Sequence, residues 1–465
     1  MDVEILSRIQ FAFTIAFHYI YPPLSIGIGL LLVIFEGLYL KTKNKEYELL
    51  TRFWIKIFAL TFGIGVATGI VMEFEFGTNW ATYSRYVGDV FGSALAAEGL
   101  FAFALESGFL GILLFGWNRV SPTFHFLSTI GVFLGSLFSA VWIVVANSWM
   151  QTPAGYHIVG EGLEARAEIV DFWAMVFNPS SIDRILHVWI GAFLAGAFVV
   201  LSVHAYYLLR NKHVGLSRKG FKTALLVATV FSLSQLFTGH RSAGTVAEHQ
   251  PAKLAALEGH FDSLAVADLY IAGWVDKKQK TVTGLAIPGG LSFLIHQDFK
   301  TPVKGLDAFP KSEQPPAINA VFQFYHLMVA IGLALIGLSL LACWQWYRRK
   351  LFTARWLLWL FVFAAFLPQL ANQFGWYAAE MGRQPWVVYG LLKTSDALSK
   401  AVTANQVLFS LIMFTVVYVL LFALFVYMLN KKIQHGPEEL VLMDSRPLQQ
   451  EIGNIISTKK PDNHG

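Results

Sequence analysis

The chain has 465 residues, of which 55% are hydrophobic and only 14% are charged, and its formal net charge is +5. Soluble domains carry about 25% charged residues, so a deficit over the whole length excludes an ordinary soluble protein and indicates a multi-span membrane protein. The positive charge does not indicate nucleic-acid binding, because excess Lys and Arg in membrane proteins usually mark cytoplasmic loops. A single cysteine, Cys343, excludes an internal disulfide and a cysteine-held zinc or iron–sulfur centre.

Nine apolar segments are long enough to cross a bilayer, which takes roughly 20 residues in a helix. We expect helices, because a spanning backbone must satisfy its own hydrogen bonds and the apolar runs lack the alternation of a β-barrel. The sequence therefore predicts an all-α integral membrane protein with about nine transmembrane helices in a bundle. The expected spans are 9–39, 52–74, 92–116, 124–146, 185–209, 221–238, 317–343, 356–380 and 405–430.

Lys and Arg collect in the loops after the first, fifth, seventh and ninth spans, and the other loops between spans are poorer in them. The positive-inside rule therefore predicts that the N-terminus lies outside and the C-terminus is cytoplasmic. Two expected outer connections are long, and the second includes an apolar stretch, 284–295, that suits the membrane surface. The expected division is helices 1–6 in 1–238, an extracytoplasmic loop in 239–316, helices 7–9 in 317–436 and a flexible cytoplasmic tail in 437–465.

Ionisable side chains inside membrane spans are costly, so each is a functional candidate. Alone, each has a plainer reading: a histidine links helices, a methionine packs, and a Glu–Arg pair is an interfacial ion pair. Together, two histidines, one methionine and one glutamate on four helices are typical of ligands around a cofactor, and heme iron accepts both His and His/Met. The candidates are His18, Glu98, Glu106, His187, His326, Met328, Glu380 and Arg383.

The depth of these candidates supports a shared site. With the N-terminus outside, they fall in the outer half of the membrane at about 1.5 Å per residue. Glu98 and Glu106 differ by about 80° around their helix and about 12 Å along it, which suits a proton relay toward a buried redox centre. Pro22 and Pro23 predict a kink in the first span that frees backbone carbonyls beside His18.

Six blocks, in order, resemble subunit I of cytochrome bd-type ubiquinol oxidases over nearly the whole chain. The block that ends span 8, with Glu380, Arg383 and the Gln-Pro-Trp that follows, is the most specific. The resemblance implies a terminal respiratory oxidase. Such an enzyme oxidises quinol at the outer face, reduces dioxygen to water with cytoplasmic protons, and generates membrane potential without pumping. The blocks are LSRIQFAFTIAFHYIYPPL, GVATGIVMEFEFGTNW, GSALAAEGLFAFALES, NSWMQTP, QPAKLAALEG and GWYAAEMGRQPW.

The resemblance implies three hemes. His187 and Met328 look like the ligands of a low-spin heme b. His18 and Glu380 look like the axial ligands of a high-spin pair, a heme b and a heme d, or a third heme b in place of heme d. Which of the two ligands holds which high-spin heme stays open. The last block also suggests Trp376 and Arg383 as cofactor-binding residues.

The remaining implied roles concern protons and quinol. Glu98 and Glu106 match the family's proton-delivery carboxylates, and Lys253 and Glu258 match its quinol-binding residues. The latter two lie in the outer loop called the Q-loop, which is short here, since only 67 residues separate Glu258 from His326. His326 stands where many relatives carry Arg, so its charge is open.

The implied partners are subunit II, a small single-span subunit, ubiquinol or menaquinol, dioxygen and membrane lipid, with no nucleic acid, in the bacterial inner membrane. The main alternative is a proton-coupled membrane transporter, because intramembrane Glu and His often serve transport. Against it, the chain shows no repeat halves, and its polar sites lie outward from the midplane. The sequence also leaves open a diheme electron carrier and a subunit that has lost its cofactors.

Overall fold

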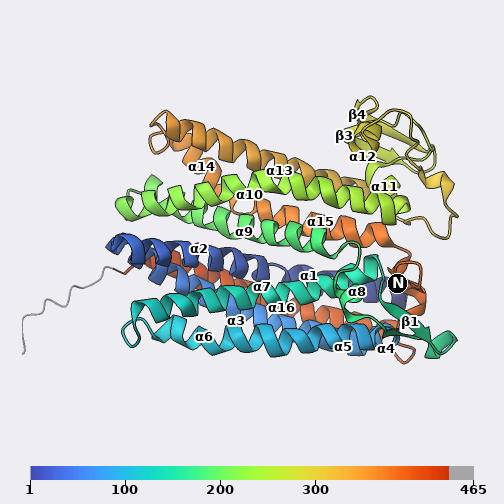
Figure 1. Cartoon of the computed structure of the whole chain (residues 1–465), viewed down its shortest axis with the longest axis horizontal. Coiled ribbons are helices and arrows are strands. Elements are labelled where there is room, and N and C mark those ends of the chain that lie inside the picture. The colour runs from blue at the N-terminus through green and yellow to red at the C-terminus, as the bar shows by residue number, and fades with distance from the viewer. Residues whose placement is uncertain (1, 439–465) are drawn as a thin grey trace, which may run out of the picture.

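The structure is a computed structural model that describes residues 2–438, apart from the side chains of 101–103 and 163. The expected tail therefore lies outside the described residues from 439 onward. Within the described range, nine helical segments are long and apolar enough to span a membrane, and they run side by side as one bundle (Figure 1). The prediction of an all-α membrane fold with nine spans is confirmed. The segments are Val3–Thr42, Lys45–Thr78, Gly88–Phe115, Pro122–Gln151, Ser181–Leu209, Val214–His249, Ile318–Tyr347, Arg355–Arg383 and Ala404–His435.

Three of these spans are interrupted helices, and short elements fill the connections. The six strands form three antiparallel pairs, each confined to a loop. The helices are α1 (Val3–His18), α2 (Tyr21–Thr42), α3 (Lys45–Thr78), α4 (Ala81–Tyr86), α5 (Gly88–Ala97), a π-helical segment (Glu98–Phe103), α6 (Ala104–Phe115), α7 (Pro122–Gln151), α8 (Phe172–Val176), α9 (Ser181–Leu209), α10 (Val214–His249), α11 (Pro251–Glu258), α12 (Gly290–His296), α13 (Ile318–Tyr347), α14 (Arg355–Ala364), α15 (Leu367–Arg383) and α16 (Ala404–His435). The strands are β1 (Tyr156–Val159), β2 (Arg166–Ile169), β3 (Leu269–Asp276), β4 (Thr281–Ile287), β5 (Trp386–Val388) and β6 (Leu392–Lys393).

The first span breaks between α1 and α2, where the Pro-Pro pair at 22–23 cannot donate backbone hydrogen bonds to the preceding turn. The expected interruption beside His18 is therefore present. Two glutamines of α15 satisfy carbonyls at the break: Gln369 donates to Tyr19 O at 2.6 Å, and Gln373 donates to Ala16 O at 2.7 Å. The break thus becomes a docking point for α15.

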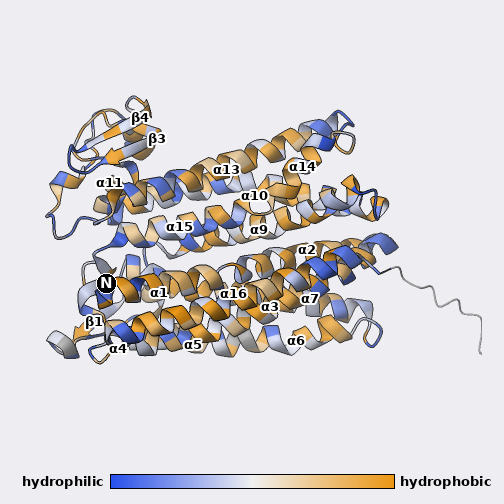
Figure 2. Cartoon of the chain, turned by 180° about the vertical axis from the view of Figure 1, so that it is seen from behind, coloured by the Kyte–Doolittle hydropathy of each residue, from blue (hydrophilic) through white to orange (hydrophobic). Residues whose placement is uncertain are grey.

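The N-terminus, the strands of the loops and the short helices α4, α8 and α11 all lie at one end of the bundle (Figure 1). The opposite end holds the tight connections, among them that between α6 and α7. Figure 2 shows mostly apolar colouring along the helices and hydrophilic colouring toward their ends. The expected grouping of the two long loops with the N-terminus is therefore present. Which membrane face each end meets stays a prediction, and the loop end is called the outer end below.

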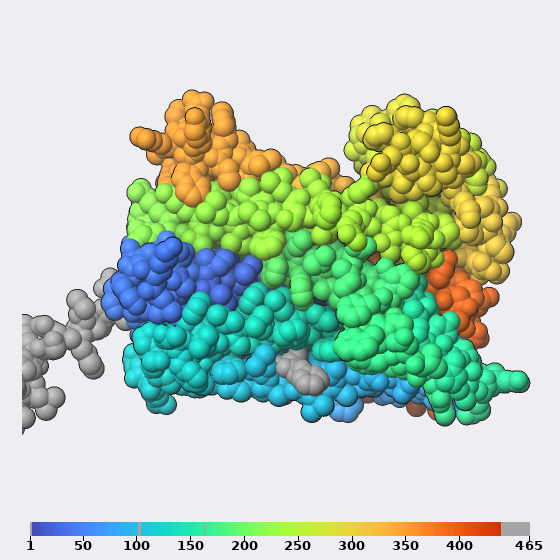
Figure 3. All heavy atoms as spheres, viewed as in Figure 1, coloured from blue at the N-terminus to red at the C-terminus, as the bar shows by residue number. Residues whose placement is uncertain are grey.

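The Q-loop starts later than the expected 239, because α10 continues through His249. It then forms α11, the β3–β4 hairpin and α12, and stands out as a lobe beside the outer ends of α10 and α13 (Figure 3). The apolar stretch 284–295 belongs to β4 and α12, in which Leu285 and Phe293 are exposed. Its contact with the membrane surface stays a prediction.

Close packing of α2 on α9 sets the centre of the bundle. A Cβ at Gly27 would lie 2.3 Å from Ala192 O, and a Cβ at Gly196 would lie 2.3 Å from the backbone of Gly27. Only glycine fits at these two crossing positions, and small residues of this kind let membrane helices approach closely. The contact holds α9, which carries His187, against α2, and α9 also packs on α7.

Candidate active site

The polar side of α15 makes hydrogen bonds to neighbouring helices in the outer half of the bundle. Gln369, Gln373, Trp376, Glu380 and Arg383 follow one another at spacings of four and three residues, so they lie along one face of the helix. A polar stripe in a membrane span must face other helices. The stripe reaches α1 through its two glutamines and α7 through Glu380.

Glu380 is held by three side chains. Asn147 Nδ2 and Gln151 Nε2, one turn apart on α7, donate to Oε1 at 3.2 and 3.1 Å. Arg383, one turn further along α15 and only 3% exposed, pairs with Oε2. The structure therefore brings the predicted Glu380 and Arg383 together and fixes the orientation of the carboxylate.

Lys253 is connected to this carboxylate through Gln151. Its Nζ donates to Gln151 Oε1 at 2.9 Å and to Gln250 Oε1 at 3.2 Å, and the residue is 3% exposed. Burial, together with nearby Arg184, holds the pKa of Lys253 well below its usual range, although Glu380 opposes the shift. The hydrogen-bonded series Lys253–Gln151–Glu380 therefore joins an expected quinol-binding residue to an expected heme ligand.

Glu258 ends α11 on the side of α13. It is 1% exposed, and burial raises the pKa of its carboxyl to about 7, a shift that the nearby Tyr325 hydroxyl partly opposes. A carboxyl with a pKa near neutrality exchanges a proton readily at physiological pH. Lys253 and Glu258 thus occupy the same short helix but face different helices of the bundle.

His18 is held in one tautomer by Thr68. The threonine hydroxyl donates to Ile64 O at 2.9 Å, so it accepts from His18 Nδ1 at 3.0 Å. The proton therefore sits on Nδ1, and the lone pair of Nε2 is available to a metal. A carbonyl, carboxylate or hydroxyl that fixes the other ring nitrogen is the usual arrangement around ligating histidines.

His187 has a similar neighbour on α10. Thr238 Oγ1 lies 3.1 Å from Nδ1 and donates to the backbone of Gln235, and Gln235 Nε2 lies 3.0 Å from His187 Nε2. Met328 approaches from α13, where a Cβ at Gly375 of α15 would stand 2.8 Å from its sulfur. Both expected ligands therefore lie on helices that pack against α10 and α15.

Glu98 and Glu106 both face α7. Ser139 Oγ donates to Glu98 at 2.5 Å, and Ser136 donates to Glu106. Glu98 begins the π-helical segment, an irregularity frequent at functional sites. The expected shared face is thus present, and the two serines are three positions apart on α7.

Trp376 and His326 complete the expected set. The ring centroids of Trp376 and Tyr19 are 5.6 Å apart. The guanidinium of Arg184 stacks over the Trp376 ring, 5.5 Å from its centroid. His326 Nδ1 is 2.8 Å from Phe322 O, and its Nε2 is 2.8 Å from Tyr270 O in β3. Both partners are carbonyl oxygens, which only accept, so the ring of His326 is anchored between its own helix and the Q-loop hairpin, and its charge stays open.

Arg184 was not among the site residues predicted from the sequence. It lies in the first turn of α9, one turn before His187, donates to Asn147 and covers Trp376. Its spacing of three residues from His187 was a usable signal. Gln151, Thr68 and Thr238 gave no signal, because a hydroxyl or an amide in a span is common.

Unpartnered buried donors test whether these residues fit a heme. Two guanidinium groups have buried nitrogens without a hydrogen-bond partner: Nε and Nη1 of Arg383, and Nε of Arg184. Leaving such donors unpaired costs about 1–3 kcal/mol each, and more for charged groups, so they are expected to meet an anion. Guanidinium groups match carboxylates, the groups that heme carries at its edge. With the ligand nitrogen of His18, these residues fit heme, whereas ligation by His187 would require the amide of Gln235 to leave Nε2.

Comparison with known proteins decides the family. The family model for cytochrome bd terminal oxidase subunit I matches residues 6–437. The chain belongs to this family. Cytochrome bd ubiquinol oxidase subunit 1 of Bacillus subtilis is 38% identical over 98% of this chain and all of that protein. Cytochrome bd-II ubiquinol oxidase subunit 1 of Escherichia coli is 34% identical over 97% and 99%.

A solved structure supports the same assignment. The bd oxidase from Geobacillus thermodenitrificans superposes with a TM-score of 0.87 at 30% identity, covering 94% of this chain and 99% of that one. The resemblance inferred from the six sequence blocks is confirmed, and the transporter alternative loses its basis. This subunit I chain is therefore a multi-pass membrane subunit of a cytochrome bd-type terminal quinol oxidase.

Proposed function

We propose that this chain is the heme-bearing subunit that oxidises quinol at the outer end of the bundle and reduces dioxygen to water. The observation that carries the proposal is the series Lys253–Gln151–Glu380, which links the quinol-binding helix α11 to a heme ligand without a gap. The relatives, named as ubiquinol oxidase subunits, support the choice of substrate.

Four residues would hold the hemes. His187 and Met328 would ligate a low-spin heme b, and His18 and Glu380 would ligate the high-spin pair, a heme b with a heme d or a third heme b. When bound, the hemes supply one-electron redox chemistry and an open iron position for dioxygen. Thr68 and Thr238 would orient the ligating imidazoles, and the guanidinium groups of Arg383 and Arg184 would hold the heme carboxylates.

Lys253 and Glu258 would handle quinol. Lys253, buried with its Nζ donating to Gln151, would donate a hydrogen bond to a quinol oxygen. Glu258, with a pKa of about 7, accepts a proton from quinol and passes it to the outer solvent. Ubiquinol and menaquinol are both candidate substrates.

Glu106 and Glu98 would deliver the protons that water formation consumes. Each accepts a hydrogen bond from a serine of α7, and Glu106 lies deeper in the span. Protons drawn from the inner side cross most of the membrane, and each charge moved is worth about 2.3 kcal/mol per 100 mV. Turnover therefore generates a membrane potential without a pump.

The assembly would include subunit II, a small single-span subunit and lipid, in a bacterial inner membrane. Helix α16 carries no candidate ligand and exposes large apolar residues along its length, which suits lipid or a neighbouring subunit. Phe409, Ile412 and Leu420 are among the most exposed of these.

A reduced-minus-oxidised visible spectrum of membranes holding the chain and its partner tests the proposal. We expect a low-spin b band with a red-shifted chlorin band, or b bands alone in the heme b variant, together with quinol-driven oxygen uptake. His187→Ala and Met328→Ala should remove the low-spin signal, and His18→Ala and Glu380→Ala should alter the high-spin signals. Spectra without heme bands, or ligand variants with unchanged spectra, would overturn the assignment.

A further inference from the structure

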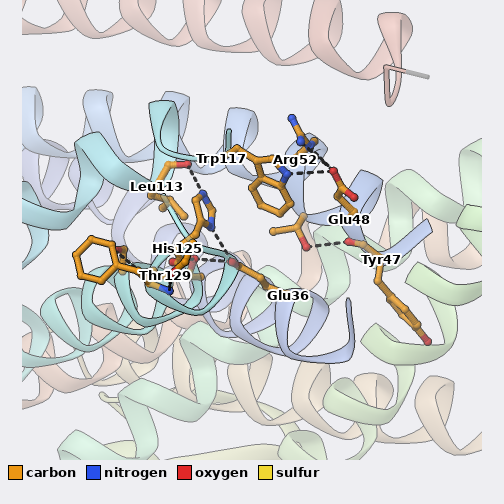
Figure 4. A network of polar contacts seen from close by, with 12 residues as sticks. Glu36, Tyr47, Glu48, Arg52, Leu113, Trp117, His125 and Thr129 are labelled. Atoms are coloured by element: carbon orange, nitrogen blue, oxygen red, sulfur yellow. Dashed lines mark hydrogen bonds and ion pairs between the residues drawn. The ribbon is translucent and has the colours of Figure 1, made fainter. Parts of the chain in front are cut away.

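The inner end of α7 holds a buried ion pair that the proposed reaction does not use (Figure 4). Glu36 Oε1 of α2 lies 2.6 Å from His125 Nδ1 of α7, and both side chains are 2% exposed. Thr129, one turn further along α7, donates to the other oxygen of Glu36 at 2.5 Å. Both carboxylate oxygens of Glu36 are therefore hydrogen-bonded by side chains from one face of α7.

The contacts fix how many protons this pair holds. His125 Nε2 lies 3.2 Å from Leu113 O, which can only accept, so Nε2 carries a hydrogen. One further proton then sits between Nδ1 and Glu36, on either the imidazole or the carboxyl. The pair is neutral overall in both forms, which explains why the membrane interior tolerates it. The pair therefore shares one proton, which can lie on His125 Nδ1 or on the carboxyl of Glu36.

The pair lies close to the inner surface. His125 is the fourth residue of α7, and the ring of Trp117 stands 4.4 Å from the ring of His125. On its other side, Trp117 Nε1 donates to Glu48 at 3.0 Å. The charged groups that face the pair are thus Glu48 and its partners Arg52 and Lys45, and Lys45 has a 66% exposed side chain. The indole of Trp117 therefore lies between the Glu36–His125 pair and the charged groups Glu48, Arg52 and Lys45.

The same face of α7 leads from the pair to the proton-delivery carboxylates. His125, Thr129, Ser136 and Ser139 are separated by four, seven and three residues, so they form one helical stripe. Ser136 and Ser139 contact Glu106 and Glu98. Thr129 and Ser136 are about 10.5 Å apart along the axis, with buried Val132 between them. Transfer across this step therefore requires water.

We propose that Glu36 and His125 form the proton-loading site of the α7 route, upstream of Glu106; this rests on the proposed function. A proton from the inner solvent binds the neutral pair and gives an imidazolium beside a protonated Glu36. Glu36 then releases its proton past Thr129 to the carboxylate of Glu106, and the neutral pair is restored. No electron moves in this step, and one proton enters for each proton delivered.

The test uses the whole oxidase in liposomes, with oxygen added to the reduced enzyme and proton uptake followed by a pH-indicator dye. Glu36→Gln should slow proton uptake about tenfold or more, with heme spectra and quinol affinity unchanged. Thr129→Val keeps the pair and removes the hydroxyl contacts to Glu36 and to the His125 carbonyl, so it should slow uptake less. Ser128→Ala is the matched control, because Ser128 is buried beside Thr129 and its hydroxyl donates to the Phe124 carbonyl and not to Glu36.

Glu106→Gln separates the two proposals. Slow uptake in Glu106→Gln with normal uptake in Glu36→Gln and Thr129→Val overturns the loading site and leaves the proposed function intact. Normal uptake in Glu106→Gln overturns the α7 route itself and the loading site with it. If Glu36→Gln does not assemble, Thr129→Val decides: slowed uptake supports the loading site, and uptake equal to that of Ser128→Ala overturns it.

Discussion

At the inner end of the bundle, Glu36, Glu48 and His125 find all their partners within the chain, whereas at the outer end Arg383 and Arg184 keep buried N–H groups without one. Both ends bury charge, with Glu36, His125 and Arg383 each at most 3% exposed. The difference teaches that the inner cluster is complete as protein, while the outer cluster has donors shaped for an anionic group from outside the chain. The three predictions that follow test that difference.

Breaking the inner pair should have the largest effect on stability. His125→Leu leaves Glu36 buried without its cation, which should lower the free energy of unfolding by about 3–5 kcal/mol. Thermal melting of the purified oxidase, followed by heme absorbance, measures the loss. The double variant Glu36→Leu/His125→Leu should recover much of it, because no unpaired charge remains. A single variant as stable as the parent would show that the pair contributes nothing.

Removing an outer guanidinium should act on cofactor and turnover instead. Arg383→Leu deletes the partner of Glu380 and two donors that face the heme site, so heme content and oxygen uptake should fall about 10–100-fold. Arg241→Leu is the control, because Arg241 pairs with Asp183 at 2.8 Å at the same end but is 54% exposed. Equal heme content in the two variants would contradict the heme-facing role of Arg383.

The smallest effect concerns the pH dependence of stability. The native pKa of Glu258, about 7, lies above the ordinary value of 4.5 because of burial. The native state therefore holds this proton more tightly than the unfolded chain, so stability falls as pH rises from about 4.5 to about 7. Glu258→Gln should melt roughly 2–4 °C above the parent at pH 8 and equal it at pH 4.

Melting curves across this pH range measure the difference, with exposed Glu313→Gln as the control. A Glu258→Gln variant whose advantage does not change with pH would contradict the raised pKa. Quinol oxidation by the same variant should also lose its rise with pH through about 7, since the accepting carboxylate is absent.

The sequence alone determined the number of spans, the break before Pro22 and the identity of the main candidates. These follow from composition and local chemistry: about 20 apolar residues span a bilayer, proline lacks a donor, and a charge within a span has a cost. The stripe on α15 was also readable, because its residues are spaced at three and four. The blocks around His18 and Glu380 carried the family, which the comparisons confirm.

Only the tertiary structure decided which side chains from distant spans meet. Gln151 joins Lys253 to Glu380 across 102 and 229 residues of sequence, and Thr68 sets the tautomer of His18 from 50 residues away. The pairing of Glu36 with His125 was equally hidden. Hydrogen bonds depend on ångström distances and directions that the packing of whole helices sets, so no local pattern encodes them.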